Sequence, residues 1–229
     1  MRPKVEYYFD FLSPYSYLSW QWVRRNQENI EFSYFPVILG QVIHHYETKG
    51  PAEIEPKREY LFKHCLRYAQ KHNIAFKAPK KLPFNSLYGL RMAVFENSGK
   101  NQFAVIDALF GAGWGHGYDI GNPDVLLSIL KEAGLPAKEL LDNVSDPSVR
   151  KALKNNVQQA HKKNIFGLPS FLAEPNPTAK PQAELIHAGE RAELFWGNDS
   201  IEDLENYLAG CDKLSEHSFK EFQLNSQFS

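Results

Sequence analysis

The sequence has few cysteines and no Cys-x-x-Cys pair. Cys65 and Cys211 are the only cysteines among 229 residues, and they stand far apart. A disulfide framework is therefore not indicated. Dithiol redox chemistry needs one thiolate to attack and a second to resolve, so this chain has no motif for it. We expect Cys65 to be a core residue of a helix over residues 59–72.

Long apolar runs and an excess of charge of one sign are also absent. No stretch approaches the length of a membrane-spanning helix, and residues 1–6 contain no apolar run of the signal-peptide kind. Lys and Arg number 26 against 27 Asp and Glu, which gives no reason to expect nucleic acid or a membrane surface as a partner. His44 and His45 are adjacent and share no helix face, so no metal site is predicted. We expect a cytoplasmic protein.

The most informative stretch joins an apolar strand to a helix. Apolar residues alternate over residues 4–11, and Ser13 and Pro14 stand where the N-cap and first residue of a helix over 14–27 belong. A second alternating strand at 30–35 completes a parallel βαβ unit. The N-terminus of that helix favours an anion, and a serine hydroxyl there can donate to a negatively charged sulfur or oxygen. The same Ser-Pro-Tyr-Ser is also compatible with a simple helix cap.

This layout resembles the redox end of a thioredoxin-type fold, with serines where that fold has Cys-x-x-Cys. A second segment, Phe-Gly-Leu-Pro-Ser-Phe-Leu at 166–172, follows a polar helix at 148–163 and begins a short strand. Thioredoxin-like proteins carry a cis-proline at this junction. We therefore expect a cis Leu168–Pro169 bond facing Ser13, with the backbone of Leu168 open to an extended peptide. The alternative is an ordinary trans proline that enters an edge strand.

A third segment, Phe-Trp-Gly-Asn-Asp-Ser-Ile at 195–201, is a turn-and-cap sequence that opens an amphipathic helix at 200–209. Asp199 could cap that helix and do nothing more. Alternatively, the N–H groups there receive a carboxylate while the Asp199 side chain accepts from an ammonium. That pair of functions suits the head group of a γ-glutamyl residue.

Together these motifs resemble the 2-hydroxychromene-2-carboxylate isomerases and the kappa-class glutathione transferases. The likeness spans nearly the whole chain, including Pro-Phe-Asn-Ser-Leu at 83–87 and Trp-Gly-His-Gly at 114–117. It implies an α/β fold, a DsbA-like thioredoxin domain with a large all-helical insertion. The thioredoxin-like part covers residues 1–38 and 165–211, with later strands at 170–173 and 184–187. The helical insertion covers 39–164, and 212–229 form a tail.

The resemblance also implies glutathione as cofactor, a homodimer, and a set of site residues. Ser13 is the catalytic residue, as a hydrogen-bond donor to the glutathione sulfur; no base adjoins it in sequence that could make it a nucleophile. The cofactor-binding set is Ser13, Tyr15, Lys49, Leu168, Pro169, Asn198 and Asp199, and the substrate set is Asn85 and Trp114. Two positions depart from relatives: Thr48-Lys49 replaces a Gly-Asn before Gly50-Pro51, and Ser200 replaces an arginine.

The function implied is a glutathione-dependent cis–trans isomerisation of 2-hydroxychromene-2-carboxylate or a similar small aromatic unsaturated oxo acid. Lys49, Lys57 or Arg58 could hold the substrate carboxylate, and the sequence does not choose among them. Two alternatives stay open. One is a kappa-like glutathione transferase that releases the adduct as product. The other is a non-catalytic thioredoxin-fold protein that binds peptides in the Pro169 groove.

Overall fold

The fold is built around a mixed sheet of strands. A computed structural model describes residues 2–174, 192–212, 214 and 222. The strands run in the order β2-β1-β3-β4, with β1 parallel to β2 and β3 antiparallel to both neighbours. They are β1 (Lys4–Phe9), β2 (Glu31–Pro36), β3 (Ser170–Ala173) and β4 (Glu193–Trp196). Helix α1 (Pro14–Asn26) connects β1 to β2, so the predicted parallel βαβ opening is confirmed.

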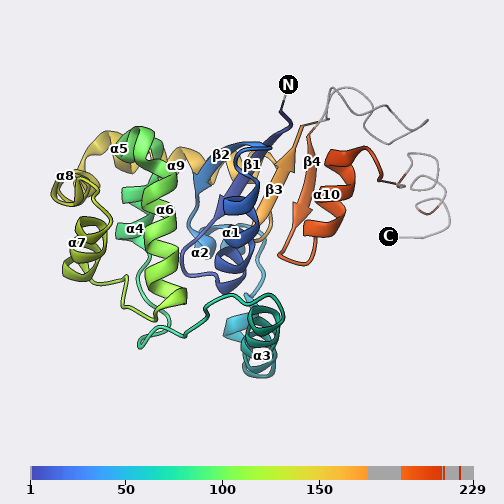
Figure 1. The fold of residues 1–229 in the computed structure, drawn as a ribbon, viewed down its shortest axis with the longest axis horizontal. Coiled ribbons are helices and arrows are strands. Elements are labelled where there is room, and N and C mark those ends of the chain that lie inside the picture. The colour runs from blue at the N-terminus through green and yellow to red at the C-terminus, as the bar shows by residue number, and fades with distance from the viewer. Residues whose placement is uncertain (1, 175–191, 213, 215–221, 223–229) are drawn as a thin grey trace.

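Helices cover both faces of the sheet (Figure 1). Alternation along β1 places Tyr7 and Tyr8 in separate hydrophobic clusters on opposite faces. The Tyr7 face is covered by α1 and α10 (Ile201–Ala209), and the Tyr8 face by α2 (Leu39–His45) and α9 (Pro147–Lys162). Two layers of helices around one sheet bury β1 on both sides, and the end of this buried strand carries the candidate site.

Residues 39–162 are helical wherever they form regular structure, as predicted. Prolines punctuate this region: Pro123 and Pro147 each begin a helix. Helices α4 to α8 form a group beside β2, whereas α3 lies apart from them, near the start of α1 (Figure 1). The helices are α3 (Glu55–Lys71), α4 (Leu87–Ala93), α5 (Phe95–Ser98), α6 (Gln102–Phe110), α7 (Pro123–Glu132) and α8 (Ala137–Asp142), with a π-helical turn at Gly111–Gly115. None of the described helices is long and apolar enough to cross a membrane.

The predicted strand at 184–187 lies outside the described residues. The segment predicted as a turn from Phe195 begins instead as strand β4, because Phe195 pairs with Phe171 in an antiparallel register and the turn starts only at Gly197. The first strand also ends earlier than predicted, at Phe9, because the chain turns at Asp10.

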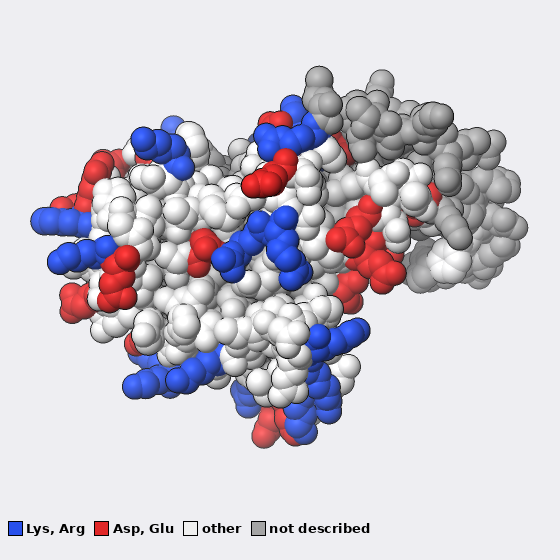
Figure 2. All heavy atoms as spheres, viewed as in Figure 1, with Lys and Arg blue, Asp and Glu red and all other residues white. Residues whose placement is uncertain are grey.

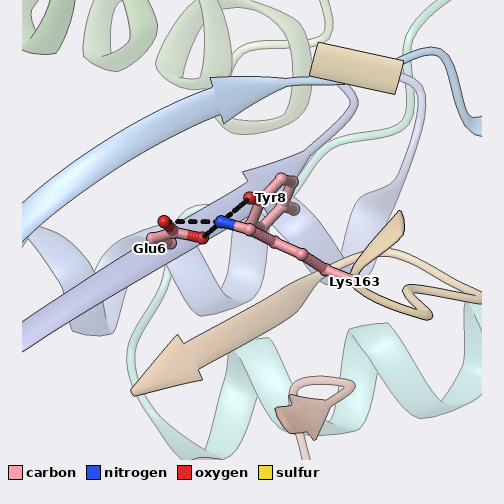
Figure 3. Close-up of polar contacts among 3 residues, drawn as sticks. All are labelled: Glu6, Tyr8 and Lys163. Carbon is pink, nitrogen blue, oxygen red and sulfur yellow. Dashed lines mark hydrogen bonds and ion pairs between the residues drawn. The ribbon is translucent and has the colours of Figure 1, made fainter. Parts of the chain in front are cut away.

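A three-residue cluster fixes the end of α9 to the sheet. The ammonium of Lys163 lies 2.7 and 2.5 Å from the two carboxylate oxygens of Glu6 and 3.2 Å from the hydroxyl of Tyr8 (Figure 3). The Tyr8 hydroxyl donates to the same carboxylate over 2.7 Å. Because Lys163 immediately follows α9 and the chain then runs to Leu168 and Pro169, this cluster helps place the proline loop against β1.

Candidate active site

The turn between β1 and α1 is held by Asp10. Its carboxylate accepts hydrogen bonds from the backbone N–H groups of Leu12 and Leu39, both over 2.9 Å, and its carbonyl accepts from the N–H of Ser13 over 3.0 Å. Burial raises the pKa of this carboxyl, while bonds from Leu12, Leu39 and the Ser86 side chain act in the opposite direction. One side chain therefore joins the turn, the start of α2 and the start of α4, and it fixes the position of Ser13.

Ser13 is the N-cap of α1. Its hydroxyl oxygen accepts from the N–H of Ser16 over 3.2 Å, and its own proton is donated to the carbonyl of Leu168 over 3.3 Å. Ser13 is 4% exposed. A donor–acceptor distance of 3.3 Å is long for a hydroxyl, so the bond to Leu168 is weak and the proton can be redirected to a stronger acceptor.

The proline loop faces this serine. The Leu168–Pro169 peptide bond is cis, and the carbonyl of Leu168 accepts the hydrogen bond from the Ser13 hydroxyl. The sequence prediction that this bond is cis and lies opposite Ser13 is confirmed. A second cis bond, Leu82–Pro83, was not predicted; it lies in the connection before α4.

The third motif adjoins the proline loop through Gly197, whose N–H donates to the carbonyl of Pro169 over 2.9 Å. Gly197 has a φ of +92°, and a Cβ there would lie 2.4 Å from a carboxylate oxygen of Asp199. Any side chain is strained at this φ, so the turn favours glycine. The next residue, Asn198, is 4% exposed, and its side-chain oxygen has no hydrogen-bond partner among the described residues. Asp199 is exposed.

Tyr15 connects the serine turn to a pocket against α3. The pocket has a volume of about 370 Å³ and is lined by Tyr15, Pro51, Pro56, Lys57, Tyr60 and Leu61. The Tyr15 hydroxyl lies 3.0 Å from Nδ1 of His64. Burial, followed by the charges of Cys65, Asp199 and Tyr60, raises the pKa of Tyr15 to about 12.

Three further residues predicted for the site, Lys49, Asn85 and Trp114, do not line this pocket. Lys49 is exposed and is not among the residues that line the pocket, so its role stays a prediction. Asn85 is exposed, and its side-chain oxygen accepts from the N–H of Leu87 at the start of α4. Trp114 is predicted to line a substrate cavity, but the structure buries it completely. Its indole N–H donates a hydrogen bond to the carbonyl of Phe11 over 2.8 Å. It supports the β1–α1 turn from within the core.

The site therefore combines a helix N-terminus, a buried serine hydroxyl with a weakly held proton, an exposed carboxylate and an unpartnered amide oxygen. These groups suit a ligand with an anionic atom at one end and hydrogen-bond donors at the other. No group of His, Cys, Asp and Glu residues that could hold a metal ion occurs in the described part of the chain.

Comparison with known proteins agrees with this architecture. The family model of the DsbA-like thioredoxin domain matches residues 4–209. The chain belongs to the DsbA-like thioredoxin family. Within this family, the sequence is 26% identical over 215 residues to a 2-hydroxychromene-2-carboxylate isomerase of Sphingobium xenophagum, covering 91% of this chain and 99% of the relative. It is also 26% identical to glutathione S-transferase kappa 1 of Rattus norvegicus, covering 91% and 92% of the two chains. The resemblance inferred from the motifs is thereby confirmed.

Solved structures share the fold of this chain. A 2-hydroxychromene-2-carboxylate isomerase superposes with a TM-score of 0.74 at 20% identity, covering 99% of both chains. The cytosolic disulfide reductase DsbM of Pseudomonas aeruginosa, in a structure with GSH, superposes with a TM-score of 0.58 at 18% identity, covering 97% of this chain and all of that one. At these identities the superpositions establish the fold, and the activity must be argued from the site.

Sequence reasoning missed three residues of this DsbA-like site. Asp10 reads as a polar position at the end of an alternating strand, although an acidic residue directly before a helix start is a recognisable signal for an Asx turn. His64 and Tyr60 lie on α3, about 50 residues from Tyr15 in sequence, and nothing local marks them as its neighbours. Their proximity results from the packing of α3 against α1.

Proposed function

We propose that this protein catalyses the glutathione-dependent cis–trans isomerisation of 2-hydroxychromene-2-carboxylate or a closely similar aromatic unsaturated oxo acid. The observation that carries the proposal is the contact between the Ser13 hydroxyl and the carbonyl of Leu168 beside a cis-proline. At this helix start a redox enzyme has paired thiols, whereas this chain has a serine hydroxyl, which is a neutral hydrogen-bond donor.

The residues present fit glutathione. The buried, unpartnered side-chain oxygen of Asn198 needs a donor, which a peptide N–H or an ammonium supplies. Asp199 can accept from the γ-glutamyl ammonium, and the Leu168 backbone can pair with the cysteinyl unit as an added strand. Ser13 would then donate to the sulfur. Of the cofactor-binding residues expected from the sequence, Lys49 has the least support, because it lies outside the pocket next to Tyr15.

When bound, glutathione supplies a thiolate whose reversible addition to a conjugated double bond makes that bond rotatable. The chain contributes the hydroxyl of Ser13 and the dipole of α1, both of which favour a charged sulfur over a neutral thiol. The hydroxyl donates and keeps its proton. No histidine or carboxylate is found within hydrogen-bond distance of Ser13 among the described residues, so the serine is a donor and not a nucleophile.

The pocket favours Lys57 as the partner of the substrate carboxylate. Of the three basic residues that the sequence left open, Lys57 alone is among those that line it. Helix α3 carries five basic residues against Glu55 and Glu59, and Figure 2 shows blue side chains gathered over this helix. A local excess of positive charge attracts an anionic substrate to this end of the molecule.

A kappa-like transferase is the second candidate, since the rat kappa enzyme is as similar in identity as the isomerase. The two activities differ in the fate of the sulfur. Incubation with 2-hydroxychromene-2-carboxylate and glutathione, followed by liquid chromatography and mass spectrometry, separates them. We expect the isomerised oxo acid with glutathione unchanged. Accumulation of a stoichiometric adduct would favour the transferase, and no product of either kind would overturn both.

A further inference from the structure

Tyr15 and His64 form a side-chain pair beside the pocket. Tyr15 lies in the first turn of α1, two residues after Ser13, and it lines the 370 Å³ pocket. His64 comes from the middle of α3 and reaches the Tyr15 hydroxyl with Nδ1 over 3.0 Å. The ring of His64 is also stacked on Tyr60, with an interplanar angle of 6°. The imidazole therefore contacts two tyrosines that line the pocket, and its contact with Tyr15 is a hydrogen bond.

The direction of this hydrogen bond decides what Tyr15 can do. If Nδ1 of His64 carries the proton, it donates to the Tyr15 oxygen, and the tyrosine proton is free to point into the pocket. If Nε2 carries the proton, Tyr15 donates to Nδ1 instead. An oxygen acceptor in the pocket favours the first arrangement, because two hydrogen bonds then replace one. The raised pKa of Tyr15, about 12, keeps its hydroxyl protonated at neutral pH.

The other lining residues indicate which acceptor fits. Lys57 supplies a positive charge, and Pro51, Pro56, Tyr60 and Leu61 supply apolar walls. A hydroxyl donor and an ammonium in one pocket match the adjacent ketone and carboxylate of a 2-oxo acid, while the apolar walls match an aryl group.

We propose that Tyr15 is a catalytic residue whose hydroxyl donates a hydrogen bond to the ketone oxygen of an aryl 2-oxo acid, and that His64 is the residue that positions this hydroxyl. This inference rests on the proposed function for its reaction and extends it to the residues that recognise the substrate. When a nucleophile adds to the far carbon of the conjugated system, a carbon–nucleophile bond forms and the π electrons move to the ketone oxygen. When that bond breaks, the electrons return, and no proton is consumed. A donor fixed at this oxygen stabilises the charge that develops there.

The test uses a ligand that cannot react. The saturated compound 2-oxo-4-phenylbutanoate keeps the ketone, carboxylate and ring but has no double bond to attack, and 4-phenylbutanoate lacks the ketone as well. Isothermal titration of each ligand into the protein gives the preference for the ketone as a ratio of dissociation constants. We expect Tyr15→Phe to reduce that preference by about 2- to 12-fold, the range that corresponds to one net hydrogen bond.

Variants of His64 separate positioning from packing. His64→Leu should reduce the ketone preference as Tyr15→Phe does, whereas His64→Asn, whose side-chain nitrogen replaces Nδ1, should restore most of it. His72→Leu is the matched control, because His72 contacts Tyr68 at the same spacing further along α3. This control should leave the preference unchanged.

Failure of this inference can be distinguished from failure of the proposed isomerase reaction. A merely structural link between α1 and α3 would lower the stability of Tyr15→Phe and His64→Leu without changing the preference, and that result would overturn the inference. So would wild-type protein that binds neither ligand. If the preference depends on Tyr15 and His64 but the chromene is not turned over, the proposed reaction fails and the 2-oxo acid site stands. If turnover occurs while the preference is insensitive to Tyr15, only the inference fails.

Discussion

Replacing Ser13 with alanine removes a hydroxyl that has two separate roles. In the absence of ligand the oxygen caps α1 by accepting from Ser16, and loss of an N-cap costs about 1 kcal/mol of stability. With a thiolate present, the same group would donate a hydrogen bond to a charged acceptor, worth about 1.5–3 kcal/mol. If that bond is stronger in the transition state than in the ground state, turnover should fall by about 10- to 150-fold.

Ser16→Ala is the matched control for this experiment. Ser16 lies on the same helix, and its side-chain oxygen is buried with no hydrogen-bond partner among the described residues. Removing that hydroxyl should leave turnover unchanged and stability equal or slightly higher. Both variants are assayed with 2-hydroxychromene-2-carboxylate at saturating glutathione, well below the melting temperature, with circular dichroism as the check on folding.

The result that refutes this reasoning is equal activity in Ser13→Ala and wild type under these conditions. Ser13 would then be only a helix cap, and a thiolate would be stabilised elsewhere. Ser13→Cys adds a second test, because it restores a thiol at the position of the redox relatives. A glutathione-independent isomerase in this variant would mean that the serine position can host the nucleophile itself.

Three further predictions concern the rest of the chain. Burial raises the pKa of Asp10 in the folded state. The contribution of Asp10 to the free energy of unfolding is therefore complete below the ordinary aspartate pKa near 4, and it is lost as pH rises through the folded-state pKa. Urea unfolding should therefore show wild type more stable relative to Asp10→Asn at pH 5 than at pH 8, and a constant difference would contradict this. Lys163→Met should lower the free energy of unfolding by about 1 kcal/mol, since the ion pair is about one-third exposed, while Lys162→Met, at an exposed neighbour, should change it little; equal effects would contradict the role of the cluster. The protein should not reduce insulin, because burial raises the pKa of Cys65 to about 12 and Cys211 is an unpaired, exposed cysteine; reductase activity that depends on either cysteine would be inconsistent with this.

The parts of the fold that were predictable from sequence depend on local signals. Alternation along β1, the cap at Ser13 and the prolines that begin α7 and α9 are all determined by neighbours in the chain. The cis bond at Pro169 came from family resemblance to a thioredoxin-like fold, since nothing in Leu-Pro alone requires it.

The errors arise where tertiary contacts decide. Phe195 reads as part of a turn because glycine and asparagine follow it, but pairing with Phe171 draws it into a strand. The resemblance implies a substrate cavity lined by Trp114, yet the indole N–H of Trp114 donates to the buried carbonyl of Phe11. The partnership of Tyr15 with His64 depends on how α3 packs and has no local signature.

The measurement that tests the central claim most directly is a progress curve for 2-hydroxychromene-2-carboxylate with glutathione present at a concentration well below that of the substrate. The account predicts that isomerisation proceeds to equilibrium, that its initial rate rises with glutathione and falls to background without it, and that all the glutathione is recovered unchanged. Isomerisation at full rate without glutathione, or a reaction that stops once the glutathione is consumed, would contradict the claim that this chain uses glutathione as a true cofactor.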